Sequence, residues 1–218
     1  MTETGQVRQV GAEAGSAPGR GVRLPRTERR AQLLAAAQAV FAANGYHAAA
    51  MDDIAERAGV SKPVLYQHFP GKLDLYIALL ESHVDTLVKT VQQALTSTTD
   101  NKQRVRNAVG AFFDFVNGDV GAFRMVFESD LRGEPAVQAA VDRATSASVD
   151  AITETITADA GLDEEKARLL AVGLVGMSQV SARFWLANSS MSQDEAVALT
   201  STLAWRGIGA GFPLSGRD

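Results

Sequence analysis

The sequence predicts an all-α protein, and three observations lead to this fold class. Apolar residues recur at helical spacing along most of the chain, no segment alternates like a strand between hairpin turns, and no unit repeats. The 218 residues suffice for a small domain joined to a larger one, and the 46% apolar fraction fits a globular protein. There is no cysteine, which excludes a disulfide framework, a thiol nucleophile and a Cys-based zinc site.

The first four helices are predicted from their end residues and their apolar faces. One helix runs from an N-cap at Thr27 to a stop at Asn44-Gly45, and its apolar face holds Leu33, Leu34, Ala37, Val40 and Phe41. A second, shorter helix ends at Gly59. Ser61 can cap a third, which tolerates Pro63 because a first-turn amide has no helical partner. A fourth begins near Lys72, with the stripe Tyr76, Leu79, Leu80, His83, Val84, Leu87 and Val91.

Five further helices are predicted in the rest of the chain, at residues 102–117, 120–131, 134–158, 163–187 and 192–208. Glycines lie at their breaks, at Gly118, Gly133 and Gly161. Ser192 followed by Glu195 matches a capping box, a signature of a helix N-terminus.

The second and third helices have the spacing of a helix-turn-helix. Ala55 is small enough to let the two helices approach, Gly59 permits a left-handed backbone in the turn, and Val60 and Leu65 fill the wedge between them. This spacing alone also occurs at ordinary helical corners.

The run GVSKPVLYQHF from Gly59 to Phe69, followed by Lys72, closely resembles the DNA-binding signature of the TetR family of bacterial transcriptional regulators. The resemblance covers residues 27–75 and departs at Ala49-Ala50, where the family commonly has Thr or Ser. It implies an N-terminal three-helix helix-turn-helix domain at 26–72, followed by a larger helical ligand-binding and dimerisation domain at 73–210. Residues 1–25 are then expected to form a disordered basic arm, and residues 211–218 a C-terminal tail.

The third helix is expected to face DNA with the side opposite its buried residues. Leu65 and Phe69 share the inward face, which turns outward Pro63, Val64, Tyr66 and Gln67, while Lys62 lies at the exposed N-terminus. Gln67 can pair with adenine, Val64 can touch a thymine methyl group, and Lys62 can reach guanine or phosphate.

By the same resemblance, Tyr66, His68 and Lys72 look like contacts to the DNA backbone, which fix register without reading sequence. Two of these residues have an alternative interpretation. Tyr66 can be an aromatic residue that packs within the domain, and His68 can be a helix-end residue without a DNA contact.

The charge distribution permits this DNA interpretation despite a net charge of −4. Residues 1–75 carry 9 Lys and Arg against 7 Asp and Glu, whereas residues 76–218 carry 12 against 18. Positive charge therefore concentrates in the N-terminal part, where duplex DNA would attract it. The arginines between Arg20 and Arg30 either stay solvated or enter the minor groove of the DNA.

The predicted helix at 163–187 has two apolar or small stripes, whereas a helix buried on one face needs only one. One stripe can pack within the domain and the other on a second copy, and two recognition helices then read two half-sites. The residues predicted at this homodimer interface are Gly173, Gly176, Val180, Phe184 and Leu203. The alternative is a fully buried central helix in a monomer.

A small apolar or amphipathic effector is predicted from a local concentration of aromatic residues. The residues expected to line its pocket are Phe112, Phe115, Phe123, Phe127, Met177 and Trp185, which can equally be plain core. Its polar head group has four candidate anchors, namely Asn117, Arg124, Glu128 and Arg183. A fatty acyl chain or acyl-CoA is the expected ligand, from a likeness of residues 123–131 to regulators of lipid metabolism within the family.

The predicted function is that of a cytoplasmic transcriptional regulator, a repressor by family default, that binds a palindromic double-stranded operator and is released by its ligand. No catalytic constellation, cofactor motif or metal site is found, so neither an enzyme nor a cofactor is expected. No signal peptide or membrane span is expected either. The alternatives are an all-α lipophile carrier without specific DNA binding, and a small enzyme with an unrecognised pocket.

Overall fold

The structure is a computed structural model that describes residues 24–118, 120–127, 131, 133–188 and 190–211, and in this part of the chain the regular secondary structure is entirely helical. The all-α prediction is therefore confirmed. The elements, in chain order, are α1 (Arg26–Ala48), α2 (Met51–Arg57), α3 (Lys62–His68), α4 (Lys72–Thr96), α5 (Asn101–Gly118), α6 (Val120–Phe127), α7 (Pro135–Ala160), α8 (Glu164–Asn188) and α9 (Gln193–Gly211). The predicted arm at 1–25 falls almost wholly outside the described residues, as does most of the predicted tail.

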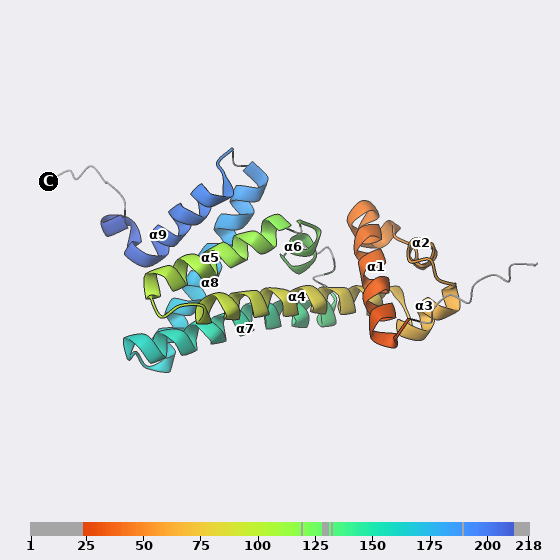
Figure 1. The fold of residues 1–218 in the computed structure, drawn as a ribbon, viewed down its shortest axis with the longest axis horizontal. Coiled ribbons are helices and arrows are strands. Elements are labelled where there is room, and N and C mark those ends of the chain that lie inside the picture. The colour runs from red at the N-terminus through yellow and green to blue at the C-terminus, as the bar shows by residue number, and fades with distance from the viewer. Residues whose placement is uncertain (1–23, 119, 128–130, 132, 189, 212–218) are drawn as a thin grey trace, which may run out of the picture.

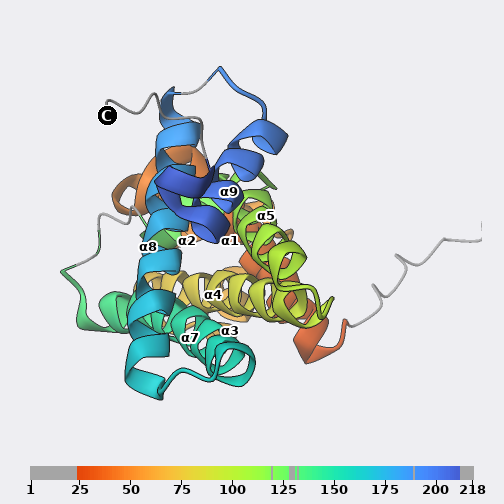
Figure 2. The same ribbon diagram turned by 90° about the vertical axis from the view of Figure 1, so that its left-hand side faces the viewer.

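Helices α1 to α3 gather at one end of an elongated molecule, and α4 runs from them toward the other end (Figure 1). Helix α7 lies along α4, and α8 packs across α7 and α5. Helix α9 lies between α5 and α8 (Figure 2). The long α4 is thus the element that reaches from the helix-turn-helix into the larger helical part.

The ends of most helices agree with their sequence signals. Gly45 breaks α1 with φ of 72°, in the left-handed region that favours glycine, so the predicted stop is confirmed. Ser61 is the N-cap of α3, although its side chain makes no capping hydrogen bond. The Glu195 N–H donates to Ser192 Oγ at 3.3 Å, which is half of the predicted capping box. The prediction of Thr27 as an N-cap is wrong, because the N-cap of α1 is Pro25, two residues earlier.

The turn between α2 and α3 has the predicted geometry. Gly59 has φ of 64°, and the Val60 N–H donates to the Ala55 carbonyl at 3.0 Å. Ala55 and Leu65 are buried between the helices. From α1, Gln32 Nε2 donates to the Ala58 carbonyl at 2.8 Å, which ties the first helix to this turn.

One continuous apolar cluster joins the two ends of the molecule. It contains Leu33 and Phe41 of α1, Leu65 of α3 and most of the buried face of α4, and it continues into Phe113 of α5 and Val197 of α9. The helix-turn-helix therefore packs on the same core as the larger part, so a displacement of α4 is felt at both ends.

Among the described residues, α8 is the one helix long and apolar enough to cross a membrane by length and composition. It nevertheless packs against α5, α7 and α9, and buries Ala167, Ala171, Val175 and Ala182 there. Its apolar character is explained by one buried face and a second face that stays exposed in the single chain.

Candidate nucleic-acid interface and ligand cavity

Helix α3 presents the predicted face to solvent. Leu65 and Phe69 are buried, whereas Tyr66 is 47% exposed and Pro63 and Gln67 are also exposed. Val64 is half-buried and Lys62 is exposed. The predicted orientation of the helix is confirmed, and contact of these side chains with DNA stays a prediction.

Lys62 is held by an ion pair that joins the two helices of the motif. Its Nζ donates to Asp52 Oδ2 of α2 at 2.6 Å, and both side chains remain more than half exposed. The hydrogen bond to Asp52 raises the pKa of Lys62. Because an exposed pair contributes little stability, it exchanges easily for a phosphate or a base edge.

A basic group surrounds the end of α3. The Arg30 guanidinium lies over the Phe69 ring, 4.6 Å from its centroid. Burial, and the positive charges of Arg26, Arg30 and Arg29, lower the pKa of His68. In the free chain the neutral imidazole is therefore favoured, and its N–H can donate to a phosphate.

Lys72 has a role that sequence reasoning missed. Its Nζ donates to three backbone carbonyls at the end of α1, those of Tyr46 at 2.8 Å, His47 at 3.2 Å and Ala49 at 2.9 Å. The ammonium also lies 4.6 Å from the centroid of the Tyr46 ring. A lysine has three N–H donors, so all of them are used within the chain. In this conformation Lys72 fastens α4 to α1, and a phosphate contact would have to replace one of these bonds.

An aromatic cluster reinforces the same junction. The ring centroids of Phe41 and Tyr76 are 5.4 Å apart, and those of Tyr46 and Tyr76 are 5.2 Å apart, both in edge-to-face geometry. Phe41 belongs to α1 and Tyr76 to α4, and both are buried. The junction of α1 and α4 consists of Lys72, Phe41, Tyr46 and Tyr76 together with the carbonyls that Lys72 contacts.

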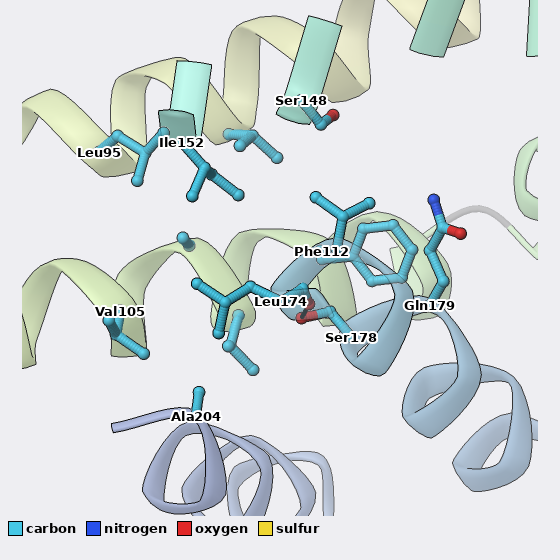
Figure 3. Close-up of a pocket in the computed structure, with 13 residues that line it drawn as sticks. Leu95, Val105, Phe112, Ser148, Ile152, Leu174, Ser178, Gln179 and Ala204 are labelled. Carbon is cyan, nitrogen blue, oxygen red and sulfur yellow. Dashed lines mark hydrogen bonds between the residues drawn. The ribbon is translucent and has the colours of Figure 1, made fainter. Parts of the chain in front are cut away.

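A mainly apolar cavity of about 70 Å³ lies in the larger part of the molecule (Figure 3). Five helices line it, namely α4, α5, α7, α8 and α9, and the α4 residues are Val91 and Leu95. Its hydroxyl groups are committed to their own helices, because Ser148 Oγ and Ser178 Oγ each donate to a carbonyl one turn earlier at 2.9 Å. The side-chain amide of Gln179, at one end of the cavity, has no hydrogen-bond partner among the described residues.

Among the predicted ligand-contacting residues whose side chains the structure describes, Phe112 alone lines this cavity. Trp185 packs on Phe113 with ring centroids 5.6 Å apart and donates its Nε1–H to the Met191 carbonyl at 3.1 Å, which gives it a structural role. Phe115 packs against the core, and Met177 is half-buried without lining the cavity. The side chains of Phe123 and Phe127 lie outside the described part of the structure.

The predicted head-group anchors that the structure describes, Asn117, Arg124 and Arg183, do not line the cavity either. Asn117 Nδ2 donates to Gln193 Oε1 at 2.7 Å, and Glu128 lies outside the described residues. The cavity is built mostly from small and aliphatic side chains of separate helices, and such a set leaves no local signal in a sequence.

The predicted dimer stripe is the exposed apolar face of α8. Val180 is 66% exposed and Phe184 is 61% exposed, with Gly173 exposed beside them. Gly176 and Leu203 are half-buried. The face continues toward the helix N-terminus through Leu169 and Val172. The alternative of a fully buried central helix does not hold in this structure.

The comparisons with known proteins agree on a family. The model of bacterial regulatory proteins of the tetR family matches residues 33–79. The chain is 56% identical over 190 residues to the HTH-type transcriptional activator FasR of Mycolicibacterium smegmatis, covering 87% of each protein.

Two solved structures share the fold. A TetR-like regulator from Rhodococcus sp. RHA1 has a TM-score of 0.64 at 28% identity, covering 85% of this chain and 98% of that one. FadR from Bacillus subtilis, solved in complex with stearoyl-CoA, has a TM-score of 0.64 at 22% identity, and the match covers 82% of this chain and 98% of that one.

Replacing Lys72 tests the junction. We expect Lys72→Met to lower the free energy of unfolding by about 1–3 kcal/mol, because charged hydrogen bonds to partly buried carbonyls are lost. Lys89→Met, at an exposed position of the same helix, is the matched control and should change the free energy by less than about 0.5 kcal/mol. Denaturant unfolding at a fixed protein concentration measures both, and equal stability of the two variants would contradict the role given to Lys72.

Proposed function

The chain belongs to the TetR family of bacterial regulatory proteins, and from this premise we propose that it binds a palindromic operator as a homodimer and senses a fatty acyl ligand. The chain is a transcriptional regulator of the TetR type, not an enzyme. One observation carries the proposal: α4 begins at the junction with Lys72 and lines the apolar cavity with Val91 and Leu95. The same rigid element thus touches the DNA-reading end and the ligand-binding end.

At the DNA end, α3 enters the major groove with its exposed face. Gln67 reads a base through its amide, Val64 contacts a thymine methyl group, and Lys62 leaves Asp52 for a phosphate or a guanine. Pro63 packs against the groove, and Tyr66 and His68 position the backbone. Lys72 acts on DNA binding through the junction, because its three donors hold the end of α1.

The dimer forms through the exposed apolar face of α8. Val180 and Phe184, both more than half exposed, bury this surface against the same surface of a second copy in a two-fold arrangement. Gly173 and Gly176 let the two helices approach closely, and Leu203 of α9 adds to the seam. Two α3 helices then reach two half-sites of one operator.

The ligand is a fatty acyl chain, free or as acyl-CoA. The cavity has an apolar lining, which matches an acyl chain, and the fold as seen in the Bacillus subtilis FadR accommodates stearoyl-CoA. The volume of about 70 Å³ is well below the roughly 300–1,000 Å³ of typical ligand pockets. A long chain therefore enters only if the lining helices move apart, and the closed cavity is the state that the ligand disfavours.

The proposed direction of regulation is taken from a relative that is 56% identical and covers 87% of this chain. FasR of Mycolicibacterium smegmatis is named an activator, so we propose activation in place of the repression expected from the family default. Activation requires that the operator-bound dimer increase transcription, and release by the ligand then lowers it. The protein works in the cytoplasm, where the operator lies.

Two substitutions in α3 test the reading of DNA. We expect Gln67→Ala to relax specificity at one base pair of each half-site, with a loss of discrimination of about 1–3 kcal/mol there. Tyr66→Ala should weaken binding to all operator variants alike. Isotherms on an operator selected from random sequence, and on its single-base variants, measure both, with Gln92→Ala on the exposed side of α4 as the control. Unchanged isotherms for both α3 variants would refute the proposed interface.

The dimer is tested by placing charge on α8. We expect the double variant Val180→Lys, Phe184→Lys to sediment as a monomer, because burying two ammonium groups in an apolar seam is costly. Ala139→Lys, at an exposed position of α7, adds charge elsewhere and should leave the dimer intact. Sedimentation velocity measures the oligomeric state, and a dimer of the double variant would rule out this face of α8 as the dimer interface.

Filling the cavity tests ligand sensing. We expect Ala108→Leu to abolish the effect of stearoyl-CoA on operator affinity, because the new side chain occupies the cavity that Ala108 lines. Ala139→Leu adds the same group to an exposed position and should respond as the wild type does. The ratio of operator affinities with and without stearoyl-CoA is the measurement, and the melting temperature checks that the variant folds. A full response in Ala108→Leu would place the ligand elsewhere.

A further inference from the structure

A second, polar cavity of about 400 Å³ lies between the start of α5 and the end of α9. Its volume is larger than that of the apolar cavity, and neither DNA binding, dimerisation nor binding of the acyl chain uses it. The residues that line it include three cations, Lys102, Arg106 and Arg206, together with the ring of Trp205 and the hydroxyls of Ser201 and Thr202.

The positive charge of this cavity is not compensated within the described part of the chain. Lys102, Arg106 and Arg206 form no ion pair there, and no carboxylate lines the cavity. By contrast, the neighbouring Arg104 is paired with Asp159, and Arg143 and Arg168 of the same domain are paired with Glu81 and Asp150. Three unpaired cations around one hollow, in a region whose net charge is negative, attract a ligand with several negative charges.

The other lining groups suit a flat heterocycle. Trp205 is 46% exposed, so the indole offers a surface on which an aromatic base can stack. Ser201 Oγ and Thr202 Oγ1 donate to the Ala198 carbonyl at 3.2 and 2.7 Å, which leaves their oxygens free to accept from an amino group. A phosphorylated nucleoside fits this site, because cations can bind its phosphates, the exposed indole can stack on its base, and the hydroxyl oxygens can accept from its amino group.

The polar cavity and the apolar cavity share two lining helices, α5 and α9, which pack against each other. Val105 of α5 and Ala204 of α9 line the apolar cavity, whereas the next residue of each helix, Arg106 and Trp205, lines the polar one. A ligand whose tail lies among the apolar residues can therefore place its head group over the α5 and α9 seam.

We propose that the site formed by Lys102, Arg106, Trp205 and Arg206 binds the phosphoadenosine head group of the acyl-CoA whose acyl chain enters the apolar cavity. The cations bind the 3′-phosphate and the diphosphate, and the indole stacks on the adenine. The inference rests on the proposed acyl sensing, and it makes the regulator respond to the activated thioester rather than to the free acid.

The test compares stearoyl-CoA with stearate by isothermal titration of the full chain at constant salt. The double variant Lys102→Ala, Arg106→Ala should bind stearoyl-CoA about 10- to 100-fold more weakly than the wild type, because charge-assisted contacts to phosphate are lost. Its affinity for stearate should stay within about twofold. The control Lys89→Ala, Arg143→Ala removes one lysine and one arginine at exposed positions elsewhere, and should bind both ligands as the wild type does.

Two results would overturn the proposal: unchanged binding of stearoyl-CoA to the double variant, or an equal loss for stearate. If the wild type binds neither ligand, the acyl-sensing proposal fails. The head-group site is then tested separately, by titrating 3′-phosphoadenosine 5′-diphosphate. Binding of that nucleotide that is lost in the double variant supports the site, whereas no binding refutes it. Quenching of Trp205 emission by the nucleotide, in a Trp185→Phe background that leaves one tryptophan, tests the stacking directly.

Discussion

The attachment of α4 to α1 is the constraint on which the rest of the account depends. Gly45 breaks α1 in the left-handed region, so the carbonyls around its end lack regular helical partners, and a buried or half-buried carbonyl needs a donor. Lys72 supplies three N–H groups to the carbonyls of Tyr46, His47 and Ala49, and the aromatic cluster packs on the same segment. The orientation of α1 to α3 is thereby fixed relative to the axis of α4, and not by a flexible linker between two domains.

This constraint explains how a ligand can act on a surface that it does not touch. Widening the cavity displaces Val91 and Leu95, and because α4 is a continuous helix inside one apolar cluster, its other end must follow. Helix α6 packs on α1, α4 and α5 and offers a second path between the ends. A coupling free energy of about 1–3 kcal/mol would change operator affinity about 5- to 150-fold, and it comes from the difference between the closed and widened cavities.

Features that depend on helical periodicity could be predicted from the sequence. Features that depend on backbone carbonyls, or on side chains from several distant helices, could not. Burial of Leu65 and Phe69, and exposure of Gln67 and Phe184, follow from helical spacing alone. The role of Lys72 could not be predicted, because its partners are carbonyls, which every residue carries, and their availability depends on the break at Gly45. The concentration of phenylalanines at 112–127 does not mark the pocket: Phe113 is core, and the cavity is lined by one to four residues from each of five helices.

The most direct test of the account is the affinity for stearoyl-CoA measured with and without a saturating operator duplex. Because coupling through α4 is reciprocal, operator binding must weaken ligand binding by the factor by which the ligand weakens operator binding. We predict a loss of ligand affinity of about 5- to 150-fold on DNA, and a smaller loss when Lys72→Met loosens the junction. Equal ligand affinity in the presence and absence of operator would contradict the claim that the cavity and the recognition helix are coupled.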